Sequence, residues 1–273
     1  MTSERPPAEQ PAPPTINTSV PHSARIWNYW LGGKDFYPVD RQVGDQIAEM
    51  YPGIFPLARA DRAFLGRAVR YLAGEAGIRQ FLDIGTGLPT ADNTHQVAQR
   101  KAPESRIVYV DNDPLVLVHA RALLTSSPEG KTDYIDADLR DVDRILSEAS
   151  RTLDFTQPVA IMLLGIMHFI LGDDEGHSIV RRLIDAVPSG SYLAISHTAG
   201  DIDVERYLPT IELWNKHGEP KMRTRTQAEI AGFFDGLELL EPGVVMYTEW
   251  RPETIDIGEF PEVPGWCGLA RKP

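Results

Sequence analysis

Apolar residues along the chain follow two different periods, and the change between them lies near residue 80. Before that point they recur every three or four positions, as in amphipathic helices. After it, short apolar runs typical of strands alternate with stretches of helical spacing, which predicts βαβ units and a mostly parallel sheet with helices on both faces. The strand-like runs are 81–84, 107–110, 132–137 (the weakest), 159–164 and 192–195, and the helical stretches are 116–123 and 179–187.

The segment before residue 80 predicts three helices. An apolar run at 26–31 ends at Gly32-Gly33, which indicates a short helix with a glycine stop. Asp40 stands where an N-cap belongs, ahead of apolar residues at helical spacing. A third helix is expected to begin at Asp61 and to end at Gly74.

The last third of the chain departs from this regular alternation. Apolar residues at 204–214 share one helical face, and a capping box at 226–229 predicts a helix that runs to Phe234. The runs at 237–240, 244–247 and 266–270 predict closing strands.

Six prolines among small polar residues in the first 21 positions predict a disordered tail, since such a segment has little apolar surface to bury. We therefore divide the chain into a tail at 1–21, an N-terminal helical extension at 22–79 and an α/β domain at 80–273.

Net charge, cysteine count and the length of the apolar stretches exclude several classes of protein. The chain has 273 residues and a formal net charge of −12 at pH 7, which disfavours nucleic acid as the main partner because phosphate contacts call for a basic surface. The single cysteine, Cys267, excludes an intramolecular disulfide. The longest apolar stretch, 159–171, is too short to span a bilayer, and the start does not resemble a secretion signal. We expect a cytoplasmic protein with no membrane association and no metal site.

A glycine-containing turn follows the first predicted strand. The segment Gly85-Thr86-Gly87 comes directly after the apolar run at 81–84 and before a plausible helix. Glycines at a strand-to-helix turn let the backbone approach a ligand closely. Standing alone, such a pair is equally consistent with an ordinary tight turn.

Acidic residues occupy the ends of three successive strands. Asp83 lies just before the glycine turn, Asp111 ends the next strand, and Asp138 follows the one after that. These positions share the carboxyl edge of the predicted sheet, where open α/β sheets bind ligands. Helix capping is the alternative role, and we assign it to Asp113, which directly precedes Pro114.

The pattern favours S-adenosylmethionine over NAD as the ligand. Thr90 stands where a pyrophosphate-binding fingerprint has its third glycine, and the carboxylate of Asp83 would repel a pyrophosphate. S-Adenosylmethionine carries an ammonium and a sulfonium group and no phosphate, so acids at the strand ends suit it better.

These motifs resemble those of class I S-adenosylmethionine-dependent methyltransferases. The resemblance rests on 83–87, Asp111, Asp138, 163–168 and 187–190. Segments 22–35, 93–95 and 226–243 are similar to a bacterial S-adenosyl methyltransferase family long catalogued as a domain of unknown function. The resemblance implies a Rossmann-like α/β fold with a mostly parallel seven-stranded sheet, helices on both faces and an N-terminal helical extension.

The same resemblance implies roles for individual residues in binding S-adenosylmethionine and its product S-adenosylhomocysteine. Those near the methionine part would be Asp83, Gly85, Thr86, Gly87, Leu164 and Gly165, the one at the ribose Asp111, and those near the adenine Asp138 and Leu139. Asn112 is a further cofactor-binding candidate.

Further candidates concern catalysis and substrate. His168 and His197 end predicted strands, where both should open onto the ligand crevice and could act as general bases, although a strand-end histidine often only bonds a neighbouring backbone group. Tyr29 and Gly33 suit a lid over the cofactor, in which case Tyr29→Ala should weaken cofactor affinity without unfolding the protein. Trp214 and Arg223 lie where this fold inserts substrate-specific elements, and a solvated basic surface is the alternative for the arginine.

The sequence therefore predicts an S-adenosylmethionine-dependent methyltransferase that acts on a small molecule. A non-catalytic S-adenosylmethionine binder is the first alternative, because methyl displacement needs no diagnostic catalytic residue. An NAD-dependent oxidoreductase is the second. Neither the methyl acceptor nor the oligomeric state follows from the sequence.

Overall fold

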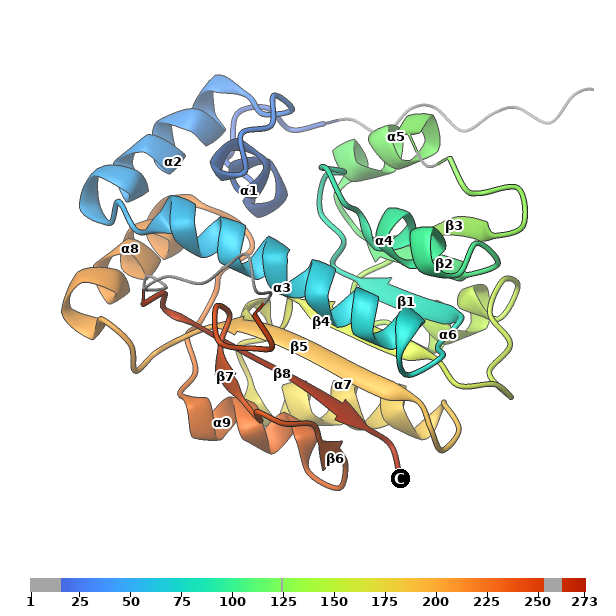
Figure 1. Cartoon of the computed structure of the whole chain (residues 1–273). Coiled ribbons are helices and arrows are strands. Elements are labelled where there is room, and N and C mark those ends of the chain that lie inside the picture. Colours follow the sequence, from blue (N-terminus) through green and yellow to red (C-terminus); the bar gives the residue numbers. More distant parts are fainter. Residues whose placement is uncertain (1–15, 124, 253–261) are drawn as a thin grey trace, which may run out of the picture.

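The computed structural model describes residues 16–123, 125–252 and 262–273, and an eight-stranded sheet runs through this part of the chain (Figure 1). Strands β1 to β5 are parallel, and the three remaining strands pair antiparallel, with the order β3-β2-β1-β4-β5-β8-β6 and with β7 also paired to β8. The strands are β1 Gln80–Ile84, β2 Arg106–Asp111, β3 Lys131–Asp136, β4 Ala160–Leu164, β5 Tyr192–Thr198, β6 Glu238–Leu239, β7 Val245–Met246 and β8 Gly265–Arg271.

The sheet has eight strands rather than the seven expected. Strands β6 and β7 are two residues long, and they pair with opposite ends of β8. Between them lies a turn at 240–244 that contains Pro242, which has no N–H to donate to a ladder. The turn therefore divides one closing strand into two.

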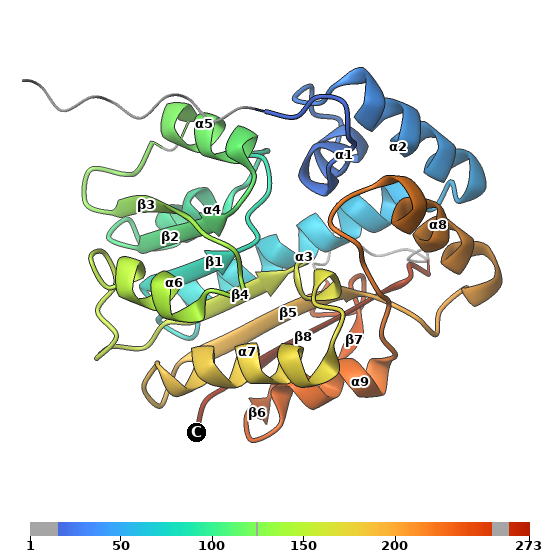
Figure 2. The same ribbon diagram turned by 180° about the vertical axis from the view of Figure 1, so that it is seen from behind.

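Helices cover both faces of the sheet, as predicted. Figure 1 shows α3 and α4 in front of the sheet, and Figure 2 shows α6 and α7 on the opposite face. The helices are α1 Ser23–Trp30, α2 Pro38–Met50, α3 Ile54–Gly74, α4 Thr94–Lys101, α5 Pro114–Leu123, α6 Val142–Ala149, α7 Asp173–Asp185, α8 Val204–His217 and α9 Gln227–Ala231, with 3₁₀ turns η1 Met167–Phe169 and η2 Gly232–Phe234. No helix in these described ranges is long and apolar enough to cross a membrane.

Side chains of successive strand residues enter different cores. Phe81 packs in the core that includes α3, whereas its neighbour Leu82 packs in the core that includes α6 and α7. The same alternation continues in β5, where Ala194 and Ile195 point to opposite faces. Both faces of the central strands are therefore buried, which explains their near-continuous apolar runs.

The N-terminal helices begin earlier than predicted. Helix α2 starts at Pro38, so Asp40 lies in its first turn rather than at the N-cap, fully buried, where its Oδ2 accepts a hydrogen bond from the backbone N–H of Tyr37. Helix α3 starts at Ile54, so Asp61 lies inside the helix rather than at its start. Pro52 and Gly53 interrupt helical structure between α2 and α3, so α3 begins directly after them.

Helix α1 ends as predicted and is fixed at both ends. Gly32 adopts a left-handed φ of +81°, the usual conformation after a helix end. Arg25 pairs with the buried Asp40 at 3.0 Å, and its guanidinium also donates to the backbone oxygen of Asn17, within the predicted tail. His22 Nδ1 lies 2.9 Å from Asp113 Oδ2 just beyond β2. Residues 1–15 of the predicted tail lie outside the described residues.

Candidate functional site

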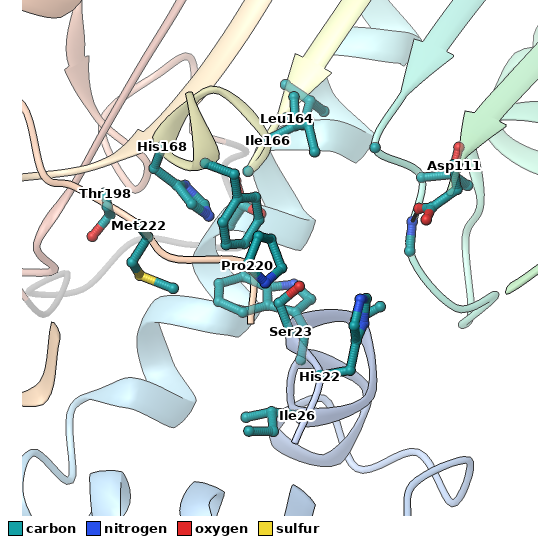
Figure 3. Close-up of a pocket in the computed structure, with 18 of the residues that line it drawn as sticks. His22, Ser23, Ile26, Asp111, Leu164, Ile166, His168, Thr198, Pro220 and Met222 are labelled. Carbon is teal, nitrogen blue, oxygen red and sulfur yellow. Dashed lines mark hydrogen bonds between the residues drawn. The ribbon is translucent and has the colours of Figure 1, made fainter. Parts of the chain in front are cut away.

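A cavity lies at the carboxyl ends of β1, β2 and β4, beneath α1, α3 and α8. Figure 3 shows Asp111 on one side of it and His168, Thr198 and Met222 on the other, with Ile26 of α1 between the two sides. We call the first side the acidic half, lined by Asp83, Gly85, Thr86, Gly87, Asp111, Asn112, Asp138 and Leu139. The second is the apolar half, lined by Ile26, Trp30, Phe169, Tyr207, Trp214, Met222 and Tyr247.

The glycine turn of the acidic half has a conformation that only glycine accommodates. Gly85 has a φ of +80°, and a Cβ atom there would lie 2.6 Å from the Cβ of Ile166. Its N–H donates to the carbonyl of Val110 at 2.8 Å, and the N–H of Gly87 donates to Asp111 Oδ2 at 2.7 Å. The turn is therefore attached to the end of β2.

Asp111 and Asp113 have different partners. Besides Gly87, the Asp111 carboxylate accepts the Asp113 N–H at 3.0 Å and lines the cavity, and burial raises its pKa. Asp113 Oδ1 accepts the backbone N–H of Leu115 at 2.8 Å. That contact is the capping role expected for the residue before Pro114.

Asp138 is held at the edge of the acidic half by neighbouring polar groups. Its Oδ2 accepts from Asn112 Nδ2 at 3.2 Å, and its Oδ1 accepts from the backbone N–H and Nη1 of Arg140 at 2.8 and 3.2 Å. Leu139 lies beside it and also lines the cavity. Three polar residues thereby meet where the ends of β2 and β3 lie side by side.

Asp83 lies deepest in the acidic half. Its Oδ2 accepts a hydrogen bond from Thr94 Oγ1 at 2.6 Å, and burial raises its pKa to about 6. Arg62 of α3 also lines the cavity and exerts an opposing attraction on this carboxylate. Its guanidinium is oriented by Ala91 O at 3.0 Å and Asn93 Oδ1 at 2.9 Å. The acidic half therefore holds a basic group that the sequence pattern did not indicate.

His168 lies at the apolar half, in the 3₁₀ turn η1 after β4. Its Nδ1 is buried without a hydrogen-bond partner among the described residues. Burial lowers its pKa to about 3, with a smaller contribution from the positive charge of Arg225, so the imidazole is neutral near pH 7. Leu164 and Gly165, which precede η1, both line the cavity, and Figure 3 shows Leu164 between the two halves.

His197, the other candidate base, lies outside the cavity lining. It follows Ser196 in β5 and precedes Thr198, which does line the cavity, so strand alternation directs His197 to the opposite face. There its Nδ1 lies 2.8 Å from the carbonyl of Thr198 and its Nε2 lies 2.9 Å from Nη1 of the buried Arg225. The expectation that this imidazole opens onto the crevice is wrong.

Of the other candidate residues, Arg223, Tyr29 and Gly33 do not line the cavity, whereas Trp214 does. Arg223 pairs with Asp173 at 3.0 Å and Glu229 at 3.2 Å, so its charge is already compensated. The hydroxyl of Tyr29 donates to Asp45 of α2, and Gly33 packs against the Asn28 side chain without lining the cavity itself. Trp214 lines the apolar half, and its Nε1 donates to the carbonyl of Pro220 at 2.8 Å.

The structure also adds a buried acid to the lining. Asp61 of α3 is 8% exposed, and burial raises its pKa to about 6. No group of three or more histidine, cysteine, aspartate and glutamate side chains within the described ranges is placed to hold a metal ion.

Comparison with known sequences decides the family. The sequence profile of the family described as S-adenosyl methyltransferase matches residues 9–273. The chain belongs to the S-adenosyl methyltransferase family. The methyltransferase therefore uses S-adenosylmethionine as its methyl donor, a cation that fits the raised carboxyl pKa values of Asp83 and Asp111 in the acidic half. Among curated proteins, no sequence matches this methyltransferase.

Solved structures support the same assignment. A DUF574 family protein from Streptomyces avermitilis is 45% identical, with a TM-score of 0.91, and the match covers 95% of this methyltransferase and all of that chain. A candidate methyltransferase from Thermobifida fusca is 40% identical, with a TM-score of 0.85 over 93% of this chain and 95% of that one.

More distant structures share the fold alone. Magnesium protoporphyrin IX methyltransferase from Synechocystis, solved with bound S-adenosylmethionine, is 11% identical and has a TM-score of 0.51. The match covers 91% of this methyltransferase and 90% of that chain. The eight-stranded α/β sheet is thus the class I methyltransferase fold.

Proposed function

We propose that the protein transfers the methyl group of S-adenosylmethionine to a small molecule held in the apolar half of the cavity. The observation that carries this proposal is the continuity of the two halves, because a single cavity extends from Asp111 to Trp214 beneath the N-terminal helices. Side chains of α1, such as Ile26 and Trp30, roof this space. A roofed apolar space suits a small acceptor better than a polymer.

The positions of the acidic-half residues suggest how they bind the cofactor. Asp111 would accept hydrogen bonds from the ribose hydroxyls, and Asp138 with the Leu139 N–H would bind the adenine edge. The backbone of 85–87 and 164–165 would contact the methionine part. Arg62, next to Asp83, would bind the methionine carboxylate, since a guanidinium pairs well with a carboxylate.

The chemistry asks little of the protein beyond positioning. S-Adenosylmethionine supplies an activated methyl group on a sulfonium, which an acceptor atom displaces in line. The chain contributes by holding the acceptor on the far side of that methyl and by excluding water. Leu164, between the two halves, marks where donor and acceptor would meet.

Thermal shifts with three ligands test this proposal. S-Adenosylmethionine and S-adenosylhomocysteine should raise the melting temperature, because a ligand that binds only the folded state stabilises it. NAD should not raise it. Stabilisation by NAD alone would overturn the assignment of the acidic half. Methyl transfer to members of a panel of amines, phenols and carboxylates would then separate an enzyme from a non-catalytic binder, and no transfer to any of them would favour the binder.

The role of Arg62 gives a separate prediction. Arg62→Gln should weaken S-adenosylhomocysteine binding about tenfold or more, because a charge-assisted hydrogen bond to the methionine carboxylate is lost. Binding of 5′-methylthioadenosine, which has no carboxylate, should be unchanged. Calorimetric titration of both ligands provides the test.

The matched control is Arg59→Gln, which removes the same charge from an exposed position of α3. Equal losses for the two ligands in Arg62→Gln would place the arginine elsewhere in the site.

A further inference from the structure

Asp61 is a buried carboxylate without an adequate partner. It projects from the middle of α3 into the cavity, and its Oδ1 is buried with no hydrogen-bond partner among the described residues. The Ser196 hydroxyl of β5 and the positive charge of Arg62 both act to lower the pKa of Asp61, but burial outweighs them, and Ser196 Oγ has no partner in hydrogen-bond geometry within the described ranges. Arg62, the next residue, directs Nε and Nη2 to Ala91 and Asn93 instead. Burial of an uncompensated carboxylate is costly, so a ligand that supplies the missing donor would bind strongly there.

A second unpartnered polar group lies near the same point. A Cβ atom on Gly165 would be 3.9 Å from Asp61 Oδ2 and 3.9 Å from His168 Cε1. Both side chains therefore border the end of β4, between the acidic and apolar halves. His168 Nδ1 has no partner among the described residues and the ring is neutral, so it can share a hydrogen bond with a ligand without adding charge.

The surroundings of these two groups are apolar and aromatic. Tyr207, Trp214 and Tyr247 line this half, and indole and phenol rings attract cations at their faces. The arginines that line the cavity make hydrogen bonds elsewhere, since Arg140 pairs with Asp138 and Arg62 donates to Ala91 and Asn93. An anionic acceptor would thus face a buried carboxylate whose burial the attraction of Arg62 does not offset, whereas a cationic acceptor would neutralise that carboxylate.

We propose that the methyl acceptor is an amine on an apolar, ring-containing body, and that Asp61 binds its ammonium group and accepts its proton. This inference rests on the proposed function. An N–H bond of the ammonium breaks and its proton moves to the Asp61 carboxylate, which leaves a lone pair on nitrogen. The lone pair forms the N–CH₃ bond as the C–S bond breaks with its electrons remaining on sulfur. The products are a methylated ammonium and S-adenosylhomocysteine, and Asp61 returns its proton to solvent.

Binding of three matched probes to the full-length protein saturated with S-adenosylhomocysteine tests the inference. The probes are 2-phenylethylamine, 2-phenylethanol and 3-phenylpropionate, which share a phenyl body and differ in the polar group. The amine should bind at least about tenfold tighter than the alcohol, and the carboxylate should bind weakest, because only the amine forms a charge-assisted contact with Asp61. Calorimetry measures all three without requiring turnover.

Variants identify the carboxylate responsible. Asp61→Asn should abolish the preference for the amine and leave S-adenosylhomocysteine affinity within about threefold, whereas Glu75→Gln, an exposed acid just after α3, should change neither. Tighter binding of the alcohol or the carboxylate, no detectable amine binding, or an unchanged preference in Asp61→Asn would overturn the inference. If S-adenosylhomocysteine itself fails to bind the parent protein, the proposed function fails instead.

Discussion

Asp111→Ala should abolish the thermal response of the protein to S-adenosylmethionine and S-adenosylhomocysteine. The variant loses an acceptor for two ribose hydroxyls, and hydrogen bonds to a charged group contribute about 1.5–3 kcal/mol each, so we expect an affinity loss of more than about 100-fold. It also loses the contacts with the N–H groups of Gly87 and Asp113, which loosens the glycine turn. Both effects act in the same direction. Calorimetric titration of S-adenosylhomocysteine measures the loss.

Two control variants separate ribose binding from turn geometry. Asp111→Asn keeps one side-chain oxygen for the N–H of Gly87 but loses the charge, so its affinity should fall less than that of the alanine variant. Asp136→Ala removes an exposed acid from β3, the register partner of Asp111, and should leave the affinity unchanged. Full cofactor binding by Asp111→Ala would show that the ribose is bound elsewhere.

Asp61→Asn should stabilise the ligand-free protein at neutral pH. The carboxyl pKa rises from about 3.9 in an unfolded chain to about 6 in the folded protein. The charged form is therefore disfavoured by folding. By linkage, this difference costs about 1–3 kcal/mol of unfolding free energy above pH 6, and an uncharged amide of the same shape avoids that cost. A gain in stability on removing a polar residue is typical of ligand-binding sites.

The pH dependence of this gain provides its check. The folded protein takes up a proton as the pH falls through about 6, so the cost declines between pH 6 and pH 4 and is absent once Asp61 is protonated in both states. Urea unfolding at pH 7.5 and pH 4.5 should therefore show a larger gain at the higher pH. Glu75→Gln should show no such difference. Destabilisation of Asp61→Asn at pH 7.5 would mean that the parent carboxylate is well compensated.

Local sequence signals predicted the α/β core well. The apolar runs found all five parallel strands, and the glycine turn with Asp111 and Asp138 lies at one cavity, as the strand-end pattern implied. These features depend on residues close together in sequence and on the rule that parallel strands share a carboxyl edge. The closing strands were also predicted, although the two short ones each pair with β8 over only two residues.

The wrong prediction for His197 could have been avoided from the sequence alone. Its neighbours Leu193 and Ile195 share its side of β5, and that side packs against α7 and η2 rather than the cavity. A period of two along the strand predicts this orientation. Assigning His197 to the same face of the strand as Leu193 and Ile195 would have excluded it from the cavity lining.

The functional roles of α3 residues could not be read locally. Asp61 stands before an apolar helical stretch, which is also what an N-cap looks like, and only tertiary packing shows that the helix starts seven residues earlier. Arg223 presents the converse case. It resembled a free basic group, yet its partner Asp173 lies 50 residues away in the chain. Side-chain pairing over such separations depends on the fold and leaves no local pattern.

Sharing of one core between the N-terminal helices and the sheet bears on how ligands enter. Ile26, Trp30 and Ile47 belong to the same buried cluster as Phe81 and Ala160 of the sheet. Rotating α1 and α2 away as a rigid flap would expose these side chains to water, at about 25 cal/mol for each square ångström of apolar surface. The roof of the cavity is therefore part of the core itself, and opening it in this way would cost folding free energy.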